Sequence, residues 1–276
     1  MSKSKAVAAM PEEEAGEGGF GNKVKIYLKE GNTEIMGNGE ERPYSLWSKL
    51  VAEFIGDLIF IFIGSISVNL AQGALINIAL AHGLAIFVLV SSLGHISGGH
   101  FNPAVTLTVA LAGKLHALWV IPYWLAQLSG GFVGALLVRA VFTLDEYDKV
   151  MGGATIPNTA ALWYQSLITE IILTMILCQT VLMCAVDTSK NVLAPLAIGM
   201  TVCLDILGGA SISGASMNPA RSLGPCAAAT IFSTVNPTMI FWDYHYVYWA
   251  GPFLGATIAA FIYRTFFAQA DDRLLP

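Results

Sequence analysis

Long apolar segments, separated by mostly short polar linkers, follow one another along most of this chain. The hydrocarbon core of a bilayer is about 30 Å thick, and a helix needs roughly 20 apolar residues to cross it. Six segments reach about that length, which predicts six membrane-spanning helices over residues 48–70, 76–96, 117–142, 161–185, 192–210 and 246–267. One longer linker, residues 143–159, is acidic and contains glycine.

Two further apolar pieces, residues 102–112 and 218–231, are too short to cross a membrane. Each begins with Asn-Pro after a Ser-Gly turn, in "SGGHFNPAV" and in "SGASMNPAR". Proline is favoured at the first position of a helix, where its missing N–H costs nothing. We therefore predict two half-helices that begin at membrane depth, where irregular backbone must be buried in protein or line a wet cavity.

The two halves of the chain repeat one pattern. "EFIGDLIFIFIG" from Glu53 resembles "EIILTMILCQTV" from Glu170, and these glutamates lie 49 and 48 residues before Asn102 and Asn218. Each half then holds three spanning helices and one half-helix. Because three is odd, the second half crosses the membrane in the opposite direction, which predicts an inverted repeat with a functional site at the midplane.

Composition agrees with a membrane protein. The chain of 276 residues is 55% hydrophobic and 12% charged, whereas soluble domains carry about 25% charged residues. A net charge of −5 argues against a nucleic-acid-binding surface. The four cysteines lie in apolar segments without CxxC spacing, so we expect free thiols, and the sequence indicates no metal site and no cofactor.

The charge pattern predicts the domain boundaries and the orientation. Residues 1–46 lack the apolar core of a signal peptide and are predicted as a disordered cytoplasmic tail. The membrane domain is placed at 47–268, with repeat one at about 47–142 and repeat two at about 161–268, and 269–276 form a short cytoplasmic tail. Of the 14 Lys and Arg residues, 11 fall on the side of the N-terminal tail, which predicts that both termini are cytoplasmic.

The two half-helices indicate how such a protein selects its solutes. In an inverted repeat they enter from opposite faces, so their N-termini can meet at the centre of the membrane. Each N-terminus carries roughly half a positive charge, which repels cations and hydronium. The Asn102 and Asn218 amides would cap these ends and offer N–H donors to a passing water molecule. The pattern thus predicts a pore centre of Asn102, Pro103, Ala104, Asn218, Pro219 and Ala220.

The two Asn-Pro-Ala motifs, the six spans and the paired glutamates resemble the aquaporin or major intrinsic protein family over about residues 47–267. The stretches "LAHGLAIFVLVSSLGHISGGHFNPAV", "PYWLAQLSGG" and "LDILGGASISGASMNPARS" are most similar to the aquaporin-8 branch. The resemblance implies an all-α membrane fold of six transmembrane helices and two re-entrant half-helices, and a homotetramer with one pore per subunit. It also implies a passive channel, not an enzyme, for water, ammonia and hydrogen peroxide. Its membrane would be the plasma membrane, with an intracellular membrane as the alternative.

The family's selectivity filter transfers by offset from the two motifs to His82, Ile206, Ala215 and Arg221. Strict water channels of the family usually have Phe and His at the first two positions, so this set implies a wider, less demanding pore. An arginine at membrane depth is a functional hypothesis by default. Structural roles remain open beside these: Arg221 could satisfy loop carbonyls, and His82 could be a buried core histidine.

The resemblance also implies that Glu53 and Glu170 anchor the pore loops, and that His95 and His100 line the cytoplasmic vestibule. A metal site formed by the two histidines is the alternative. Asp57 and Asp205 have no clear role, and they leave open a proton- or ion-coupled transporter, which can also use inverted repeats. An intramembrane hydrolase with Ser216 as nucleophile would need a base within reach, and His245 is the one histidine that follows it in the sequence.

Overall fold

The computed structural model describes residues 33–35, 41–71, 74–158, 160–188, 191–234, 241–269 and 273–274. The chain divides into two compact units, Met1–Pro43 and Tyr44–Pro276. In the first unit, β1 (Thr33–Ile35) pairs antiparallel with β2 (Glu41–Pro43), with Glu34 opposite Arg42. This hairpin lies within the segment predicted as a disordered tail, and the sequence analysis did not predict it. Residues 1–32 and 36–40, to which the same prediction applies, lie outside the described residues.

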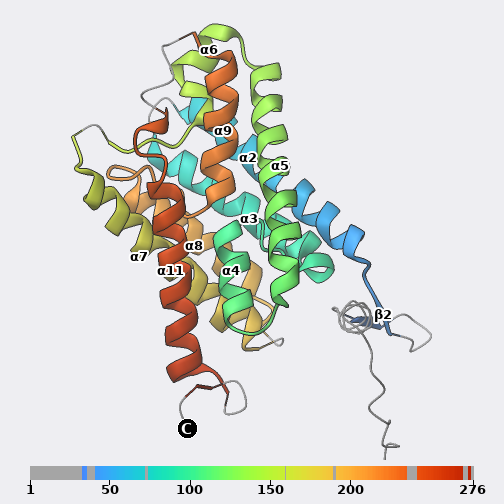
Figure 1. The fold of residues 1–276 in the computed structure, drawn as a ribbon. Coiled ribbons are helices and arrows are strands. Elements are labelled where there is room, and N and C mark those ends of the chain that lie inside the picture. Colours follow the sequence, from blue (N-terminus) through green and yellow to red (C-terminus); the bar gives the residue numbers. More distant parts are fainter. Residues whose placement is uncertain are drawn as a thin grey trace, which may run out of the picture. The chain divides into compact units, whose positions relative to one another are not determined.

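The second unit is a helical bundle (Figure 1). Its long helices are α2 (Leu46–Ala71), α3 (Leu75–Ser97), α5 (Ala117–Val141), α7 (Trp163–Val181), α8 (Ala194–Gly209) and α11 (Val247–Ile262). Helices α7 and α11 each continue into a π turn, η2 (Leu182–Val186) and η3 (Tyr263–Phe267). Among the described residues, five segments are long and apolar enough to cross a membrane: Leu46–Val68, Leu75–Ser97, Ala117–Val141, Trp163–Val186 and Val247–Phe267.

The sixth predicted span, 192–210, is shorter in the structure than the sequence suggests. Helix α8 has 16 residues, which at 1.5 Å per residue is about 24 Å. It begins with Pro195 in its first turn and ends at Gly209. Proline is favoured at the first helical positions, and glycines, here Gly208 and Gly209, are poor helix formers, so both limits agree with the local sequence.

The two predicted half-helices are present as α4 (Pro103–Leu111) and α9 (Pro219–Phe232). In Figure 1, α9 occupies the upper and α4 the lower part of the space between α5 and α11. Each half-helix packs against the last helix of the other repeat, α9 on α5 and α4 on α11. This exchange of half-helices between the two halves of the chain is the arrangement expected of an inverted repeat.

Helices α3 and α8 cross where the two repeats meet. A Cβ atom on Gly83 would lie 2.6 Å from the Gly199 carbonyl oxygen, and a Cβ atom on Gly199 would meet the Gly83 carbonyl oxygen. Glycine is therefore required on both helices, because any side chain would push the backbones apart. The reciprocal contact is what a two-fold relation between the repeats produces.

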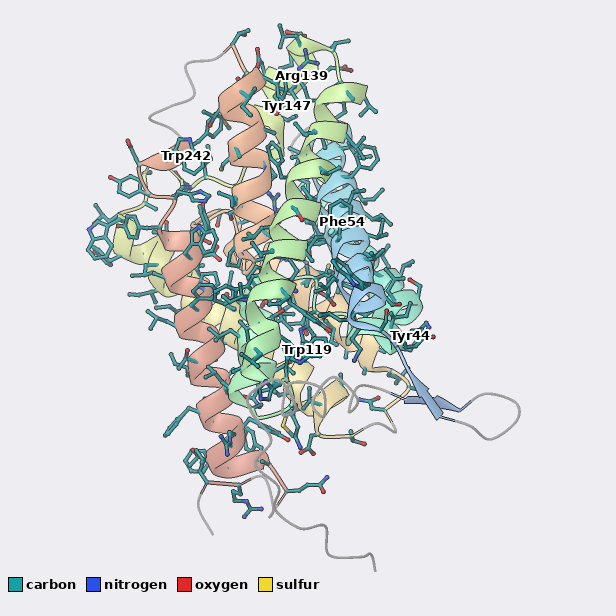
Figure 2. All side chains as sticks on the ribbon, turned by 45° about the vertical axis from the view of Figure 1, so that its right-hand side comes forward. Tyr44, Phe54, Trp119, Arg139, Tyr147 and Trp242 are labelled. Atoms are coloured by element: carbon teal, nitrogen blue, oxygen red, sulfur yellow. The ribbon has the colours of Figure 1, made fainter. Side chains whose placement is uncertain are left out.

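The linker predicted over 143–159 contains two short helices, α6 (Leu144–Lys149) and η1 (Met151–Gly153). Thr143 and Glu146 form a capping box that begins α6, since each side chain bonds the other's backbone N–H. Figure 2 shows Arg139 of α5 beside Tyr147 of α6, and the guanidinium lies 5.6 Å from the ring centroid. The linker is thus held against the end of α5.

Candidate functional site

The half-helices begin at asparagine caps. Asn102 has an extended backbone, and its Oδ1 accepts the N–H of Ala104 at 2.8 Å. Asn218 does the same in the second repeat, where its Oδ1 accepts the N–H groups of Ala220 at 2.9 Å and Arg221 at 3.3 Å. A proline follows each asparagine in the first turn. These caps satisfy helix N–H groups that would otherwise have no partner at membrane depth.

The two asparagines also join the two pore loops, which are the residues that lead into α4 (98–102) and into α9 (210–218). Asn102 Nδ2 donates to the Met217 carbonyl oxygen at 2.9 Å, and Asn218 Nδ2 donates to the Phe101 carbonyl oxygen at 2.8 Å. Each bond joins residues of different repeats, so the two helix ends are locked face to face. Each amide nitrogen keeps one further N–H that can bond a solute.

The residue before each asparagine adopts a left-handed backbone, with φ of 45° at Phe101 and 56° at Met217. Non-glycine residues rarely adopt this conformation, and such strain gathers at functional sites. Here it is compensated by a carboxylate, because Phe101 N–H donates to Glu53 at 2.7 Å and Met217 N–H donates to Glu170 at 2.7 Å. The strained turns direct the two carbonyl groups toward the opposite asparagine.

Glu53 and Glu170 are fully buried and accept further hydrogen bonds from around their own loops, and Glu53 also accepts one from Gln127 of α5. Glu53 accepts four hydrogen bonds, from Ser97 Oγ (2.6 Å), His100 N (3.0 Å), Phe101 N (2.7 Å) and Gln127 Nε2 (2.8 Å). Glu170 accepts three, from Ser213 Oγ (2.7 Å), Ser216 N (2.9 Å) and Met217 N (2.7 Å). Hydrogen bonds to a carboxylate are roughly twice as strong as neutral ones, so each glutamate fixes the shape of its loop.

Sequence reasoning missed the aromatic and amide side chains that support these loops. Tyr123 Oη donates to the Ser97 carbonyl oxygen at 2.8 Å, and Tyr248 Oη donates to the Ser213 carbonyl oxygen in the other repeat. Gln127 Nε2 bonds both Glu53 and Thr106 Oγ1. Polar residues one turn apart in an apolar span, as at 123 and 127, are the signal that could have identified them.

His82 and Arg221, two of the predicted filter residues, lie next to one another. Arg221 Nη2 is 3.5 Å from His82 Nε2, and its Nη1 donates to the Gly153 carbonyl oxygen at 2.8 Å. Arg221 is 8% exposed and His82 is 2% exposed, so both polar groups are held inside the protein. Gly153 belongs to η1 of the linker, and nothing in its sequence indicated this contact.

The surroundings of His82 fix its ring. Its Nδ1 lies 2.8 Å from the Ile78 carbonyl oxygen, which can only accept, so Nδ1 carries the proton and the lone pair of Nε2 faces Arg221 Nη2. The Phe60 ring packs against its edge with centroids 5.6 Å apart. A Cβ atom on Gly64 would collide with the imidazole, so glycine makes room for the ring.

The remaining predicted residues differ in their surroundings. Ile206 and Ala215 are buried in one apolar cluster. His100 is buried, and its Nδ1 lies 3.1 Å from Thr106 Oγ1 and therefore within the Glu53 network. His95 is exposed, with its ring 5.9 Å from that of Tyr44. The structure thus places only one of the two histidines behind the first pore loop.

The model of the family called major intrinsic protein matches residues 40–263. The chain belongs to this family. It is 42% identical to aquaporin-8 of Rattus norvegicus over 229 residues, which cover 82% of this chain and 83% of that protein. It is 40% identical to a probable aquaporin TIP1-2 of Oryza sativa subsp. japonica over 230 residues, which cover 79% and 85%.

The fold has a solved counterpart in the X-ray structure of the aquaglyceroporin from Plasmodium falciparum. The TM-score is 0.69 at 22% identity, and the match covers 79% of this chain and 96% of that one. This likeness shows the fold. As a major intrinsic protein, the chain is a membrane channel of the aquaporin family that transports water, and it is not an enzyme.

This major intrinsic protein also lacks the contact that an intramembrane hydrolase with Ser216 as nucleophile would need. Ser216 Oγ donates to the Asn218 carbonyl oxygen at 2.9 Å and lies 2.6 Å from Ser222 Oγ. Within the described part of the chain, neither ring nitrogen of His245 has a hydrogen-bond partner. Ser216 therefore has no base in contact, and it serves to hold the turn before Asn218.

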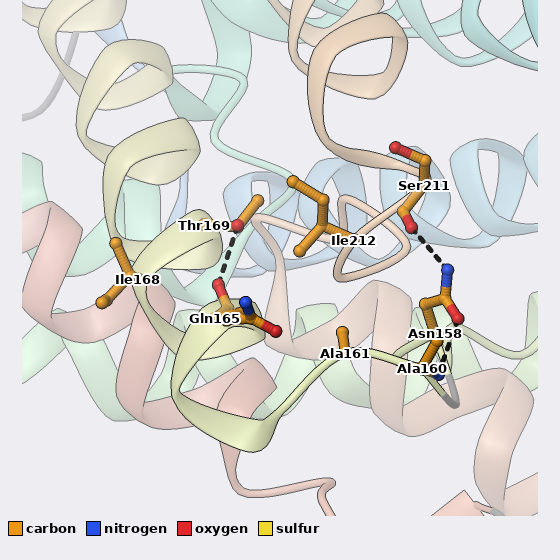
Figure 3. A pocket seen from close by; sticks show the side chains of 8 residues that line it. All are labelled: Asn158, Ala160, Ala161, Gln165, Ile168, Thr169, Ser211 and Ile212. Atoms are coloured by element: carbon orange, nitrogen blue, oxygen red, sulfur yellow. Dashed lines mark hydrogen bonds between the residues drawn. The ribbon is translucent and has the colours of Figure 1, made fainter.

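A shallow pocket of about 490 Å³ lies beside the second pore loop and is lined by none of the predicted pore residues (Figure 3). Asn158 connects the linker to the segment after α8. Its Nδ2 donates to the Ser211 carbonyl oxygen at 2.9 Å, and its backbone N–H donates to the Ile212 carbonyl oxygen at 3.0 Å. Ser166 Oγ adds a bond to the Ile212 carbonyl oxygen at 3.3 Å. These contacts brace the segment that leads from α8 to the Asn218 turn.

Proposed function

We propose that this major intrinsic protein is a passive channel that conducts water, ammonia and hydrogen peroxide and excludes ions and protons. The observation that carries the proposal is the reciprocal pair of bonds from Asn102 to the Met217 carbonyl and from Asn218 to the Phe101 carbonyl. These bonds hold two helix N-termini face to face and leave one N–H on each amide for a solute.

Charge exclusion follows from the same arrangement. Each helix N-terminus carries roughly half a positive charge, and Arg221 adds a full one nearby. A cation or hydronium that entered would meet this positive field in a site with little water to screen it. A water molecule held by two N–H donors is also poorly oriented to pass a proton along a file.

The proposed filter of His82, Ile206, Ala215 and Arg221 combines one polar wall with apolar groups. Arg221 offers N–H donors, and His82 Nε2 offers a lone pair. Ammonia and hydrogen peroxide both donate and accept hydrogen bonds, so either solute can bond both groups as water does. Glycerol is disfavoured, because the set contains no Phe, Tyr or Trp side chain to pack against its carbon atoms.

We propose further that the channel is a homotetramer with a pore in each subunit and with both termini in the cytoplasm. The positive-inside distribution of Lys and Arg supports the orientation. The family resemblance supports the tetramer, and it favours the plasma membrane over an intracellular one. Native mass spectrometry of the protein in detergent tests the assembly, because a tetramer gives four times the subunit mass.

Stopped-flow light scattering of proteoliposomes tests the solute set. We expect water, ammonia and hydrogen peroxide to cross faster than in protein-free liposomes, whereas glycerol and protons do not. An uncoupler should leave water flux unchanged. Water flux that disappears with the uncoupler would favour the coupled transporter, and glycerol flux comparable to water flux would contradict the proposed filter.

A further inference from the structure

Helix α2 contributes no side chain to the proposed filter, yet one of its glycines contacts a filter residue directly. A Cβ atom on Gly64 would collide with Nε2 of His82 and would lie 2.7 Å from Cδ2 and 2.8 Å from Cε1 of the same ring. The tip of the imidazole therefore occupies the space that a side chain at position 64 would fill. Only glycine allows this close approach of the ring to the helix.

The His82 ring is held on two further sides. Its Nδ1 lies 2.8 Å from the Ile78 carbonyl oxygen, and the Phe60 ring packs against its edge with centroids 5.6 Å apart. Its Nε2 lies 3.5 Å from Arg221 Nη2. A ring tip displaced from Gly64 would therefore move toward Arg221, which is the other polar residue of the proposed filter.

The next residue of α2 supports the Arg221 side of the filter. A Cβ atom on Gly153 would collide with Ser65 Cβ and would lie 2.5 Å from Ser65 Oγ, so the linker packs closely on α2 at this point. The Gly153 carbonyl oxygen accepts a hydrogen bond from Arg221 Nη1 at 2.8 Å. Because this contact holds Arg221, the guanidinium does not withdraw when the His82 ring moves toward it.

We propose that Gly64 is a specificity-determining residue, which sets the width of the filter by seating the His82 ring against α2. This inference rests on the proposed channel function and deepens it, because it names a residue outside the filter that decides which solutes fit. Gly64 and Ser65 together fix the separation of His82 from Arg221. A larger residue at position 64 pushes the ring out of its seat and narrows the path.

A narrower filter discriminates between solutes instead of lowering every flux equally. Hydrogen peroxide has two oxygen atoms and water has one, so peroxide is hindered more when the path narrows. A smaller amount of folded protein would lower both permeabilities by the same factor. The ratio of peroxide to water permeability therefore separates a change in filter width from a general structural defect.

The test measures both permeabilities on one preparation of proteoliposomes, water by stopped-flow light scattering and peroxide by a fluorescent probe enclosed in the liposomes. Gly64→Ala should lower the peroxide-to-water ratio about fivefold, which corresponds to about 1 kcal/mol in barrier height. In a His82→Ala background, adding Gly64→Ala should leave the ratio unchanged, because no ring remains to be displaced.

Gly94→Ala is the matched control, since it also replaces a glycine inside a helix, here α3. A Cβ atom on Gly94 would lie 3.5 Å from Val90 Cγ1, which is an ordinary van der Waals contact. This variant should keep the wild-type ratio of peroxide to water permeability.

The outcomes separate the inference from the function on which it rests. If the wild-type protein conducts neither solute, the channel function fails and the inference falls with it. If the wild type conducts both and Gly64→Ala keeps its ratio, only the inference is overturned. An equal fall of the ratio in the His82→Ala background also overturns it, because the methyl group then acts without the ring.

Folding of the variants is decisive as well. A Gly64→Ala protein that folds in neither background would show that glycine is needed for a contact other than the His82 ring. One that folds only together with His82→Ala would show that the ring cannot move into the path. Either result overturns the inference, whereas folded protein in both backgrounds with the expected ratios supports it.

Discussion

The two pore loops share a backbone plan and differ in their side chains. In each loop a buried glutamate holds the residue before the asparagine in a left-handed turn, and the asparagine caps a half-helix and bonds the opposite loop. Three residues after the asparagine, the first loop has Val105 and the second has Arg221. The shared backbone arrangement produces two helix N-termini that face one another. Because Val105 stands where the second loop has Arg221, only the second loop places a charged side chain beside His82.

The linker between the repeats adds to this asymmetry. Its Gly153 carbonyl oxygen accepts a hydrogen bond from Arg221, and Asn158 braces the segment before the second loop. Duplicating a half-helix is therefore enough to place two asparagines. The proposed filter also needs Arg221, which the second copy alone carries, together with a linker that holds it.

The largest effect is expected from breaking what the loops share. Glu53→Ala and Glu170→Ala leave four and three hydrogen-bond donors without this acceptor. Each buried unsatisfied donor costs about 1–3 kcal/mol, and the total is comparable to the whole stability of a domain. We expect both variants to lose the folded peak in size-exclusion chromatography, with Glu53→Ala at least as severe.

Glu146→Ala is the matched control for the glutamate variants, since its carboxylate caps an exposed helix of the linker. It should keep the folded peak. A folded, water-conducting Glu53→Ala protein would contradict the view that the carboxylates hold the pore loops.

A smaller effect is expected from the proposed filter, where the repeats differ. His82→Phe removes the lone pair at Nε2 and should lower ammonia permeability about fivefold more than water permeability, as for the loss of one hydrogen bond of about 1 kcal/mol. Stopped-flow measurements on one preparation give both values. His116→Phe, a change at the exposed start of α5, is the control. Equal losses of ammonia and water flux would refute this role of His82.

Weakening the brace on the second loop should have a more modest effect. Asn158→Ala removes the bond to the Ser211 carbonyl oxygen and should lower stability by about 1 kcal/mol, while the pore stays open. Thr169→Ala changes the same pocket but removes a bond within α7 only, so it should change stability less. Thermal unfolding of the two variants measures the difference, and equal melting temperatures would show that Asn158 does not brace the loop.

The smallest expected effect is a pH dependence from His245, which lies just before α11. Burial lowers the pKa of His245 to about 4 from its usual value near 6.5. The unfolded chain therefore binds the proton more readily, and stability should fall as the pH drops from about 6.5 to about 4. His245→Phe should show a smaller loss over this window in thermal unfolding. An unchanged pH dependence in that variant would contradict the assignment.

Sequence reasoning identified the half-helices because two Asn-Pro-Ala motifs at matched distances from two glutamates are visible as side-chain patterns. It missed Gly153, because a backbone carbonyl that accepts from Arg221 leaves no mark in residue type. It also predicted too long a segment around α8, since hydropathy counts apolar residues and not where Pro195 and Gly209 limit the helix. The β1–β2 hairpin was missed because its strands have three residues each.

The central claim is that solutes pass between the two asparagine amides and then beside His82 and Arg221. A cryo-electron microscopy map of the protein in lipid nanodiscs, at a resolution that shows ordered water, tests it most directly. The account predicts a single file of water peaks that touches the Nδ2 atoms of Asn102 and Asn218 and continues past His82 Nε2. A dry or blocked path at this place, with water running elsewhere through the bundle, would contradict it.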